Sequence, residues 1–297
     1  MRFRLTDDQR ALRAGVREVL DRRFGADALR AAVAKPVLDR GLWRALGEAG
    51  FFALRLPEAD GGVGLGLPEA VLAFEEAGRA LLPGPLIATC LAAGTVPGAA
   101  EGETVVAMAD GGLVEWWGAA DVVLGGDGSG AAVPMRSVDP LTPLHRVSGV
   151  SGTAPRASDP VASLFTAAEQ LGTAARACEL AVGHARTREQ FGRPIGAFQA
   201  VQHLCAEALV RVEVARVAVY AASVTGDAAD IAGARLLADE AAVQGARDCL
   251  QVFGGMGFTW EAEVHLLLKR AWVRARRAGG GPQGAELLAR ELLSGAG

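Results

Sequence analysis

Two short blocks of the sequence combine residue types that suit a ligand with phosphate groups and a flat ring. The first, residues 188–195, reads REQFGRPI and is followed by FQ at 198–199; the second, residues 251–255, reads QVFGG. An arginine fork binds phosphate oxygens, an aromatic ring packs on a flat ring, and paired glycines let the backbone approach a ligand. Taken singly, the glycine pair also fits a helix C-cap, and the arginine also fits a contact with helix carbonyls. Their occurrence together favours ligand binding.

Long helices are expected to carry both blocks. The run Ser158-Asp159-Pro160 is a strong helix start, because a capping side chain precedes a proline at the first helical position. Apolar residues at helical spacing then mark long stripes, which are interrupted by glycines at 226 and 254–255. The sequence predicts four long helices, over about residues 160–190, 198–225, 228–253 and 260–277.

The rest of the chain divides into a helical part and a short β-rich part. Residues 6–9 form a capping-box pattern that begins a first helix, and further helices are expected near residues 38–50 and 67–82. After them come five short β-favouring runs punctuated by Gly, Asp and Pro, which predict a small antiparallel unit over residues 104–108, 113–117, 121–124, 131–135 and 145–150.

The predicted fold class is therefore mainly α, in three parts. These are an N-terminal helical domain (1–98), a reduced middle β domain (99–157) and a C-terminal four-helix bundle (158–297). A chain of 297 residues is long enough to bury a sizeable core, and its alanine-rich composition suits close helix packing.

Composition argues against several classes of partner. Thirty basic and 34 acidic side chains are spread along the chain, so no field attracts nucleic acid. The four cysteines lie far apart and lack metal-ligand spacing, so no metal site is expected. No signal peptide or membrane-spanning run of about 18 apolar residues is found, and the expected compartment is the cytoplasm.

The two blocks resemble the signature blocks of the acyl-CoA dehydrogenase family, with the second continuing to residue 259. Residues 56–58, 61–64 and 75–78 are similar to the first domain of the same family. The resemblance covers both helical parts in the right order, and it points to a short actinobacterial-type subunit of a heteromeric enzyme. It implies FAD as cofactor, an acyl-CoA thioester as substrate and α,β-desaturation as the reaction.

The resemblance also implies which residues contact the flavin dinucleotide. Arg188 would bind phosphate oxygens and Phe191 would pack near the adenine, while the glycine block brings backbone amides near the diphosphate. In the family these residues reach the FAD held mainly by a neighbouring subunit, so an oligomer is implied. The implied contact set is Arg188, Gln190, Phe191, Phe198, Gln199, Gln251, Val252, Phe253, Gly254 and Gly255.

The carboxylate base that the family's reaction needs has no clear counterpart here. In most family members this Glu follows the last long helix, a place that falls at Ala278, and in others it lies at a position that falls at Ala162. Glu169, two turns further along that helix, remains a candidate base, against the commoner role of a solvated or cap-supporting side chain.

Two further features are weighed against ordinary roles. The middle part is short for the family's flavin-covering β-barrel, and Trp116-Trp117 is interpreted as a hydrophobic plug rather than a flavin cover. A basic run on the last helix would either meet a CoA or FAD phosphate or, as the favoured interpretation, form a solvated face or dipole partner. The run consists of Lys269, Arg270, Arg274, Arg276 and Arg277.

Three functional hypotheses follow from these residues. In the leading one, the chain is the smaller subunit of a heteromeric acyl-CoA dehydrogenase whose longer subunit brings the base and the β-barrel, acting on a bulky, steroid-derived acyl-CoA. In the second, it is a homo-oligomeric pseudoenzyme or scaffold that kept the helical interface. In the third, it is a lone dehydrogenase with Glu169 as base.

Overall fold

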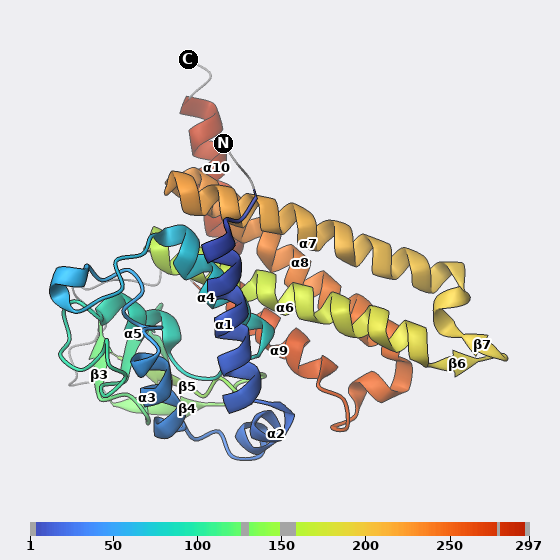
Figure 1. The fold of residues 1–297 in the computed structure, drawn as a ribbon, viewed down its shortest axis with the longest axis horizontal. Coiled ribbons are helices and arrows are strands. Elements are labelled where there is room, and N and C mark those ends of the chain that lie inside the picture. The colour runs from blue at the N-terminus through green and yellow to red at the C-terminus, as the bar shows by residue number, and fades with distance from the viewer. Residues whose placement is uncertain (1–3, 126–130, 149–158, 278–279, 295–297) are drawn as a thin grey trace.

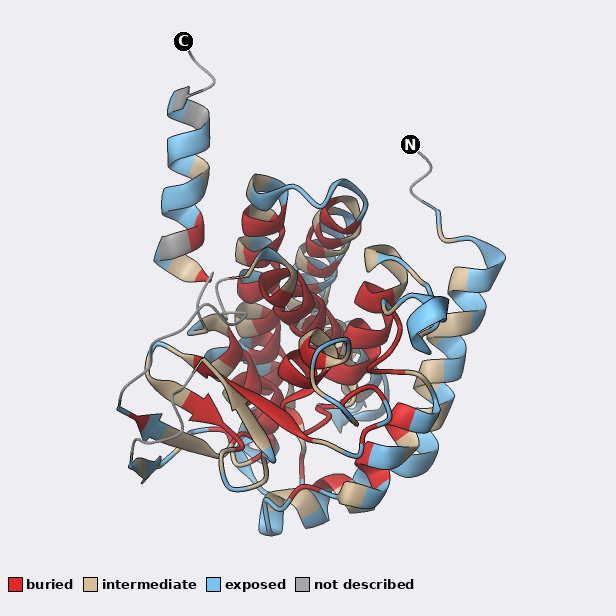
Figure 2. Ribbon diagram, turned by 90° about the vertical axis from the view of Figure 1, so that its left-hand side faces the viewer, coloured by how far each residue is buried: buried red, intermediate tan, exposed pale blue. Residues whose placement is uncertain are grey.

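The computed structural model describes residues 4–125, 131–148, 159–277 and 280–294. Within these ranges the protein is mostly helical, with a small sheet beside the N-terminal helices and a bundle of long helices that spans the molecule (Figure 1). Buried residues concentrate at the centre of the bundle and across the sheet (Figure 2). The predicted fold class is confirmed, and the residue limits of the three parts stay a prediction.

The N-terminal helices form around local signals that the sequence shows. The capping box is present, since Gln9 N donates to Thr6 Oγ1 at 3.1 Å and Thr6 N donates to Gln9 Oε1 at 3.0 Å. Two short helices, α2 and α5, were not predicted. The elements are α1 (Asp7–Arg23), α2 (Ala26–Ala34), α3 (Arg40–Glu48), a 3₁₀ turn η1 (Glu58–Asp60), α4 (Leu67–Arg79) and α5 (Leu86–Ala92).

The small sheet is not wholly antiparallel, which corrects the sequence prediction. Its strands are β1 (Val106–Asp110), β2 (Leu113–Glu115), β3 (Val122–Leu124), β4 (Ala132–Met135) and β5 (Leu144–Val147), in the order β3-β1-β2-β5-β4. Strands β1 and β3 pair in parallel, whereas the other neighbours pair antiparallel.

Strands β1 and β3 are parallel because the chain, after leaving β2, passes the start of β1 and continues along the other edge of β1. Asp121, which directly precedes β3, accepts a hydrogen bond from Val105 N at 2.8 Å, so β3 begins beside the start of β1. Arg40 of α3 holds the same carboxylate. Trp116, in the crossing turn, is 3% exposed within the main core, as expected of a hydrophobic plug.

The C-terminal bundle contains the four predicted helices with altered ends. Asp159 caps the first of them through Val161 N at 2.7 Å, while Ser158 lies outside the described residues. The elements are α6 (Pro160–Thr187), a hairpin of β6 (Glu189–Gln190) and β7 (Arg193–Pro194), η2 (Ile195–Ala197), α7 (Gln199–Thr225), α8 (Ala228–Phe253), η3 (Gly254–Phe258), α9 (Val264–Ala275) and α10 (Gly281–Ser294).

Two helix ends and one additional helix in the bundle differ from the prediction. Helix α6 stops at Thr187 because Arg188 takes an extended conformation that leads into β6. Helix α9 begins at Val264 instead of Trp260, because 3₁₀-type hydrogen bonds continue through Ala262 N to Thr259 O. Helix α10 was not predicted; it packs on α8 at its start and then projects from the body (Figures 1 and 2).

Helices α4 and α6 approach each other closely at two glycines. A Cβ on Gly172 of α6 would lie 1.9 Å from Glu75 O, and a Cβ on Gly78 of α4 would lie 2.0 Å from Glu169 O. Next to this contact, Phe74 and Phe165 stack with ring centroids 4.3 Å apart. The absence of both Cβ atoms therefore sets the spacing that places Glu169 and Glu75 in the interior.

We expect Gly172→Ala to lower the free energy of unfolding by about 1–3 kcal/mol, because the new methyl group must push two backbones apart. Gly183→Ala on the same helix is the control, since a Cβ there meets no atom within 4 Å. That change is expected to raise stability by up to about 1 kcal/mol through helix propensity. Urea unfolding of both variants checks the prediction, and equal behaviour would contradict it.

No helix among the described residues is long and apolar enough to cross a membrane.

Candidate functional site

The first sequence block forms a tight hairpin at the end of α6. Gln190 pairs with Arg193, so Phe191 and Gly192 alone form the turn, with φ of 53° and 76°. Two positive φ values are the mark of a type I′ turn, a conformation that bulky side chains rarely adopt. The turn leaves the Phe191 side chain 92% exposed. A strained turn that presents an aromatic ring to solvent indicates a binding role.

Phe198 supports this exposed ring from behind. The Phe191 and Phe198 rings meet edge to face with centroids 6.0 Å apart, and the Arg193 guanidinium lies 4.3 Å above the Phe198 ring. Phe198 is half-buried and Gln199 begins α7 in an exposed position. The side chain of Gln190 is exposed and donates to Glu189 O at 2.7 Å.

The second block lies at the end of α8, directly beside the first. His184, one turn before Arg188, stacks on Phe253 with ring centroids 4.0 Å apart and an interplanar angle of 15°. Burial lowers the pKa of His184, and the nearby Arg188 guanidinium lowers it further. This neutral stacked pair joins the ends of α6 and α8, so the two blocks form one surface.

The glycines of the second block leave this surface open. Gly254 ends α8 with φ 61°, and a Cβ built on either Gly254 or Gly255 would meet no atom within 4 Å. Gln251 is exposed, whereas Val252 is 7% exposed and packs in the core. Of this block, Val252 can therefore offer a ligand only its backbone.

These residues fit one half of a site for a flavin dinucleotide. Among the described residues, no hydrogen bond or ion pair engages the Arg188 side chain, so its donors are available to phosphate. An exposed ring, an open glycine turn and an exposed arginine provide contacts on one side of a ligand. The assignment of these residues to FAD stays a prediction. Among the described residues there is also no group of three or more His, Cys, Asp or Glu placed to hold a metal.

A second charged cluster is buried where α6, α9 and the sheet meet. Arg274 Nη1 donates to both oxygens of Glu115 at 2.8 Å, and Arg274 Nε lies 2.8 Å from Glu169 Oε2. Arg270 Nε donates to Asp139 Oδ2 at 2.6 Å. All five side chains are 10% exposed or less.

Electrostatic attraction holds Glu115 and Arg274 in their ionised forms. Burial by itself raises the pKa of Glu115, but Arg274 and Arg277 overcome it and lower that pKa to about 2. Burial likewise lowers the pKa of Arg274, and Glu115 and Glu169 more than reverse this, leaving it above its ordinary value. Glu115 and Arg274 each retain their charge because the opposite charge is already in place.

This cluster corrects the interpretation of the basic run as a solvated face. Arg270 and Arg274 are 3% and 2% exposed, and their partners come from the sheet and α6. Lys269 lies 4.6 Å above the Trp260 ring, and Arg277 lies 3.5 Å from Glu115. Arg276 alone of the five is exposed.

The same cluster decides where Glu169 lies. Glu169 is 3% exposed, so its interpretation as a solvated side chain is wrong, and its carboxylate faces Arg274. Ala162 is buried at 2% exposure with no carboxylate, and Ala278 lies outside the described residues. A role of Glu169 as base stays a prediction.

Sequence reasoning missed Glu115, Asp139 and the neighbouring pair Arg235 and Asp239. Arg235 is 0% exposed and binds Asp239 at 2.9 Å, which also accepts from Gln170 Nε2 at 2.8 Å. The spacing of Arg235 and Asp239 on one helix is a signal that could have shown this pair. No local signal marks Glu115 or Asp139.

Comparisons with known proteins bear on both clusters. The chain matches the family model "Acyl-CoA dehydrogenase, N-terminal domain" over residues 6–100 and the model "Acyl-CoA dehydrogenase, C-terminal domain" over residues 162–290. It is 36% identical to the acyl-CoA dehydrogenase IpdE2 of Mycobacterium tuberculosis, over 89% of this chain and 91% of that protein. It is 33% identical to the acyl-CoA dehydrogenase FadE34 of the same organism, over 90% of this chain but 45% of that protein.

Two solved structures share the fold. The ChsE4–ChsE5 complex from Mycobacterium tuberculosis aligns with a TM-score of 0.84 and 25% identity, over 99% of both chains. A variant of the Tcur3481–Tcur3483 steroid ACAD aligns with a TM-score of 0.82 and 25% identity, over 98% of this chain and 99% of the other.

Proposed function

Because the chain belongs to the acyl-CoA dehydrogenase family of oxidoreductases, we propose that it is the smaller subunit of a heteromeric, FAD-dependent acyl-CoA dehydrogenase. One observation carries the proposal. The hairpin at the end of α6 and the glycine turn at the end of α8 form one exposed surface. On it an arginine, an aromatic ring and the glycine backbone are open to a ligand. This surface completes the flavin site of a longer partner subunit.

Each residue of the surface has a role that its geometry supports. Arg188 binds phosphate oxygens of FAD through its free guanidinium, and Phe191 packs on the adenine end, supported by Phe198. Gly254 and Gly255 allow the diphosphate to approach their backbone. When bound, FAD accepts the hydride that leaves the acyl chain during desaturation. Residues of this chain bind and orient the cofactor only.

The proton acceptor comes from the partner subunit in this proposal. Ala162 carries no carboxylate, and Glu169 is held between α4 and α6 against Arg274. A carboxylate 3% exposed and paired with arginine is closed to a substrate. We assign Glu169 to the structural charge cluster.

The substrate class follows from the relatives. Both solved complexes named above pair two different gene products, and one is described as a steroid ACAD. We infer a bulky, steroid-derived acyl-CoA as the substrate of the heteromer. The longer subunit supplies the acyl pocket, because the middle sheet of this chain is small.

The test is the absorption spectrum of the chain purified alone and of the complex that a tag on this chain recovers from its native cells. We expect the lone chain to carry almost no flavin, because its ligand groups lie on one open face. The recovered complex is expected to contain a longer family member and bound FAD, and to oxidise a steroid-derived acyl-CoA.

Two outcomes would overturn the proposal. Stoichiometric FAD and turnover in the lone chain, abolished by Glu169→Gln, would instead support a lone dehydrogenase. A homo-oligomer that recovers neither a partner nor flavin would instead support a scaffold.

A further inference from the structure

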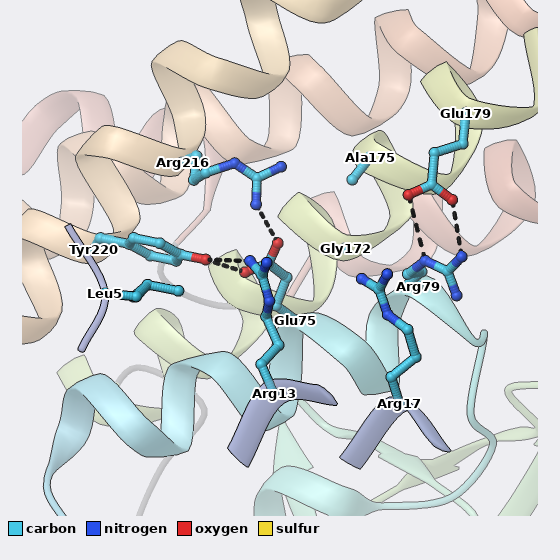
Figure 3. A pocket seen from close by; sticks show the side chains of 10 residues that line it. All are labelled: Leu5, Arg13, Arg17, Glu75, Arg79, Gly172, Ala175, Glu179, Arg216 and Tyr220. Carbon is cyan, nitrogen blue, oxygen red and sulfur yellow. Dashed lines mark hydrogen bonds and ion pairs between the residues drawn. The ribbon is translucent and has the colours of Figure 1, made fainter. Parts of the chain in front are cut away.

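A polar pocket lies between α1, α4, α6 and α7, away from the flavin-facing surface. Its volume is about 440 Å³, and four arginines from three helices line it: Arg13, Arg17, Arg79 and Arg216 (Figure 3). On α6 the lining ends at Glu179, nine residues before Arg188, a distance of about 14 Å along a helix. The pocket is therefore separate from the proposed FAD contacts.

Three carboxylates at this pocket each have an arginine partner of their own. Glu75, 3% exposed, accepts from Arg216 Nη1 and from Tyr220 OH, the latter at 2.6 Å. Glu76, 1% exposed, accepts two hydrogen bonds from Arg17 at 2.7 Å. Glu179 accepts from Arg79 Nη2 at 2.9 Å. These pairs occupy carboxylate oxygens of Glu75, Glu76 and Glu179.

Arg13 is the fourth guanidinium and has no carboxylate within hydrogen-bond distance among the described residues. Its Nε lies 4.0 Å from Glu76 Oε1, an oxygen that already binds Arg17. Its Nη1 lies 3.5 Å from Tyr220 OH, whose hydrogen is donated to Glu75. Two outer carboxylates, Glu213 and Asp21, are more than half exposed and approach Arg216 and Arg79 from the solvent side. Of the four arginines, Arg13 is thus the one whose donors are least engaged.

The pocket also lies under a helix with little apolar attachment. Of the 17 residues in α1, only Leu20 is buried. Arg13 and Arg17 add polar contacts with α4 and α7 to the packing of Leu20 and Val16. A ligand that bridges these arginines to Arg79 would fasten α1 further.

We propose that this pocket binds a small polyvalent oxyanion, a phosphate or carboxylate compound. The anion bridges Arg13 to Arg17 on the same helix, α1, and to Arg79 on α4. A guanidinium group can donate two parallel hydrogen bonds to two oxygens of one phosphate or carboxylate. Such an anion supplies the acceptors that Arg13 lacks and clamps α1 to the bundle. This site is independent of the flavin surface.

The test is thermal unfolding of the full chain with pyrophosphate or succinate, at ionic strength held constant with sodium chloride. We expect a saturable rise in Tm beyond the chloride control, and slower amide hydrogen exchange in α1. Arg13→Gln is expected to weaken the apparent affinity at least tenfold. Arg23→Gln, an exposed arginine of the same helix, is the matched control and is expected to leave it unchanged. A larger shift with pyrophosphate assigns a phosphate ligand, and a larger shift with succinate assigns a carboxylate ligand.

Two results would overturn this proposal. One is a shift with both anions no larger than that with chloride and no change in α1 exchange. The other is the same affinity in Arg13→Gln as in the unchanged chain. If Arg13→Gln fails to fold, α1 exchange in the unchanged chain with and without pyrophosphate decides the question.

Discussion

We expect Arg274→Met to lower the free energy of unfolding by about 3–5 kcal/mol, because it leaves buried carboxylates without their cation. Arg274 contacts Glu115 at 2.8 Å and Glu169 at 2.8 Å, and both carboxylates are 10% exposed or less. Methionine fills similar space but carries no charge, so the loss reports the ion pairs rather than a cavity. Urea unfolding followed by circular dichroism measures the change.

Arg276→Met is the matched control for this change. Arg276 directly follows the last residue of α9 and is exposed, so a shift within about 0.5 kcal/mol is expected. Adding Glu169→Gln to Arg274→Met is expected to recover part of the loss, since one of the unpaired charges is then removed. A stability loss as small as that of Arg276→Met would show that the cluster does not stabilise the fold.

The free energy of unfolding is also expected to change in a definite direction at acid pH. The folded-state pKa of Glu115 is about 2, below its ordinary value of 4.5. Its contribution to stability is therefore present above about pH 4.5 and is lost as the pH falls toward 2. In Arg274→Met the cation that lowers this pKa most is gone, so the loss of stability that Glu115 contributes between about pH 4.5 and pH 2 is expected to shrink.

The second large effect concerns the flavin surface. In the proposed complex with a longer subunit, Arg188→Ala is expected to weaken FAD binding about 10- to 100-fold, which corresponds to loss of one charge-assisted hydrogen bond of about 1.5–3 kcal/mol. The measurements are the flavin-to-protein ratio of the purified complex and a fluorescence titration of the apo-complex with FAD.

Arg186→Ala is the control for Arg188→Ala, because Arg186 is an exposed arginine in the last turn of α6. Size-exclusion chromatography should show intact complexes for both variants, which separates loss of cofactor from loss of assembly. Equal FAD affinity in the two variants would remove Arg188 from the flavin site. It would also favour the scaffold alternative over a half-site donor.

Much of the local structure followed from the sequence, because helix caps and turns depend on residues a few positions apart. The capping box at Thr6 and Gln9 and the cap of Asp159 form as predicted. The parallel pairing of β1 and β3 did not follow, since it depends on a contact between Asp121 and Val105 across the sheet. Helix α10 lacked a clear start signal and was missed.

For the proposed flavin surface too, part followed from the sequence and part depended on the tertiary structure. Residue types in the sequence pointed to Arg188, Phe191 and the glycine pair as candidate FAD contacts, a prediction that stays open, and Ala162 offers no carboxylate. The stack of His184 on Phe253 is what brings the two blocks together, and it could not be read from either block. Val252 was included with its neighbours, yet the turn of α8 directs its side chain into the core.

For the basic run, only the tertiary structure decided the outcome. Arg274 and Glu115 are 159 residues apart in the chain, and no periodicity relates an arginine on a late helix to a glutamate on an early strand. The same packing buries Glu169 and places its carboxylate against Arg274. The sequence alone thus indicated the family, the four long helices of the bundle and the candidate residues of the proposed half-site. Packing decided which charges are buried, because burial and pairing arise only when distant elements meet.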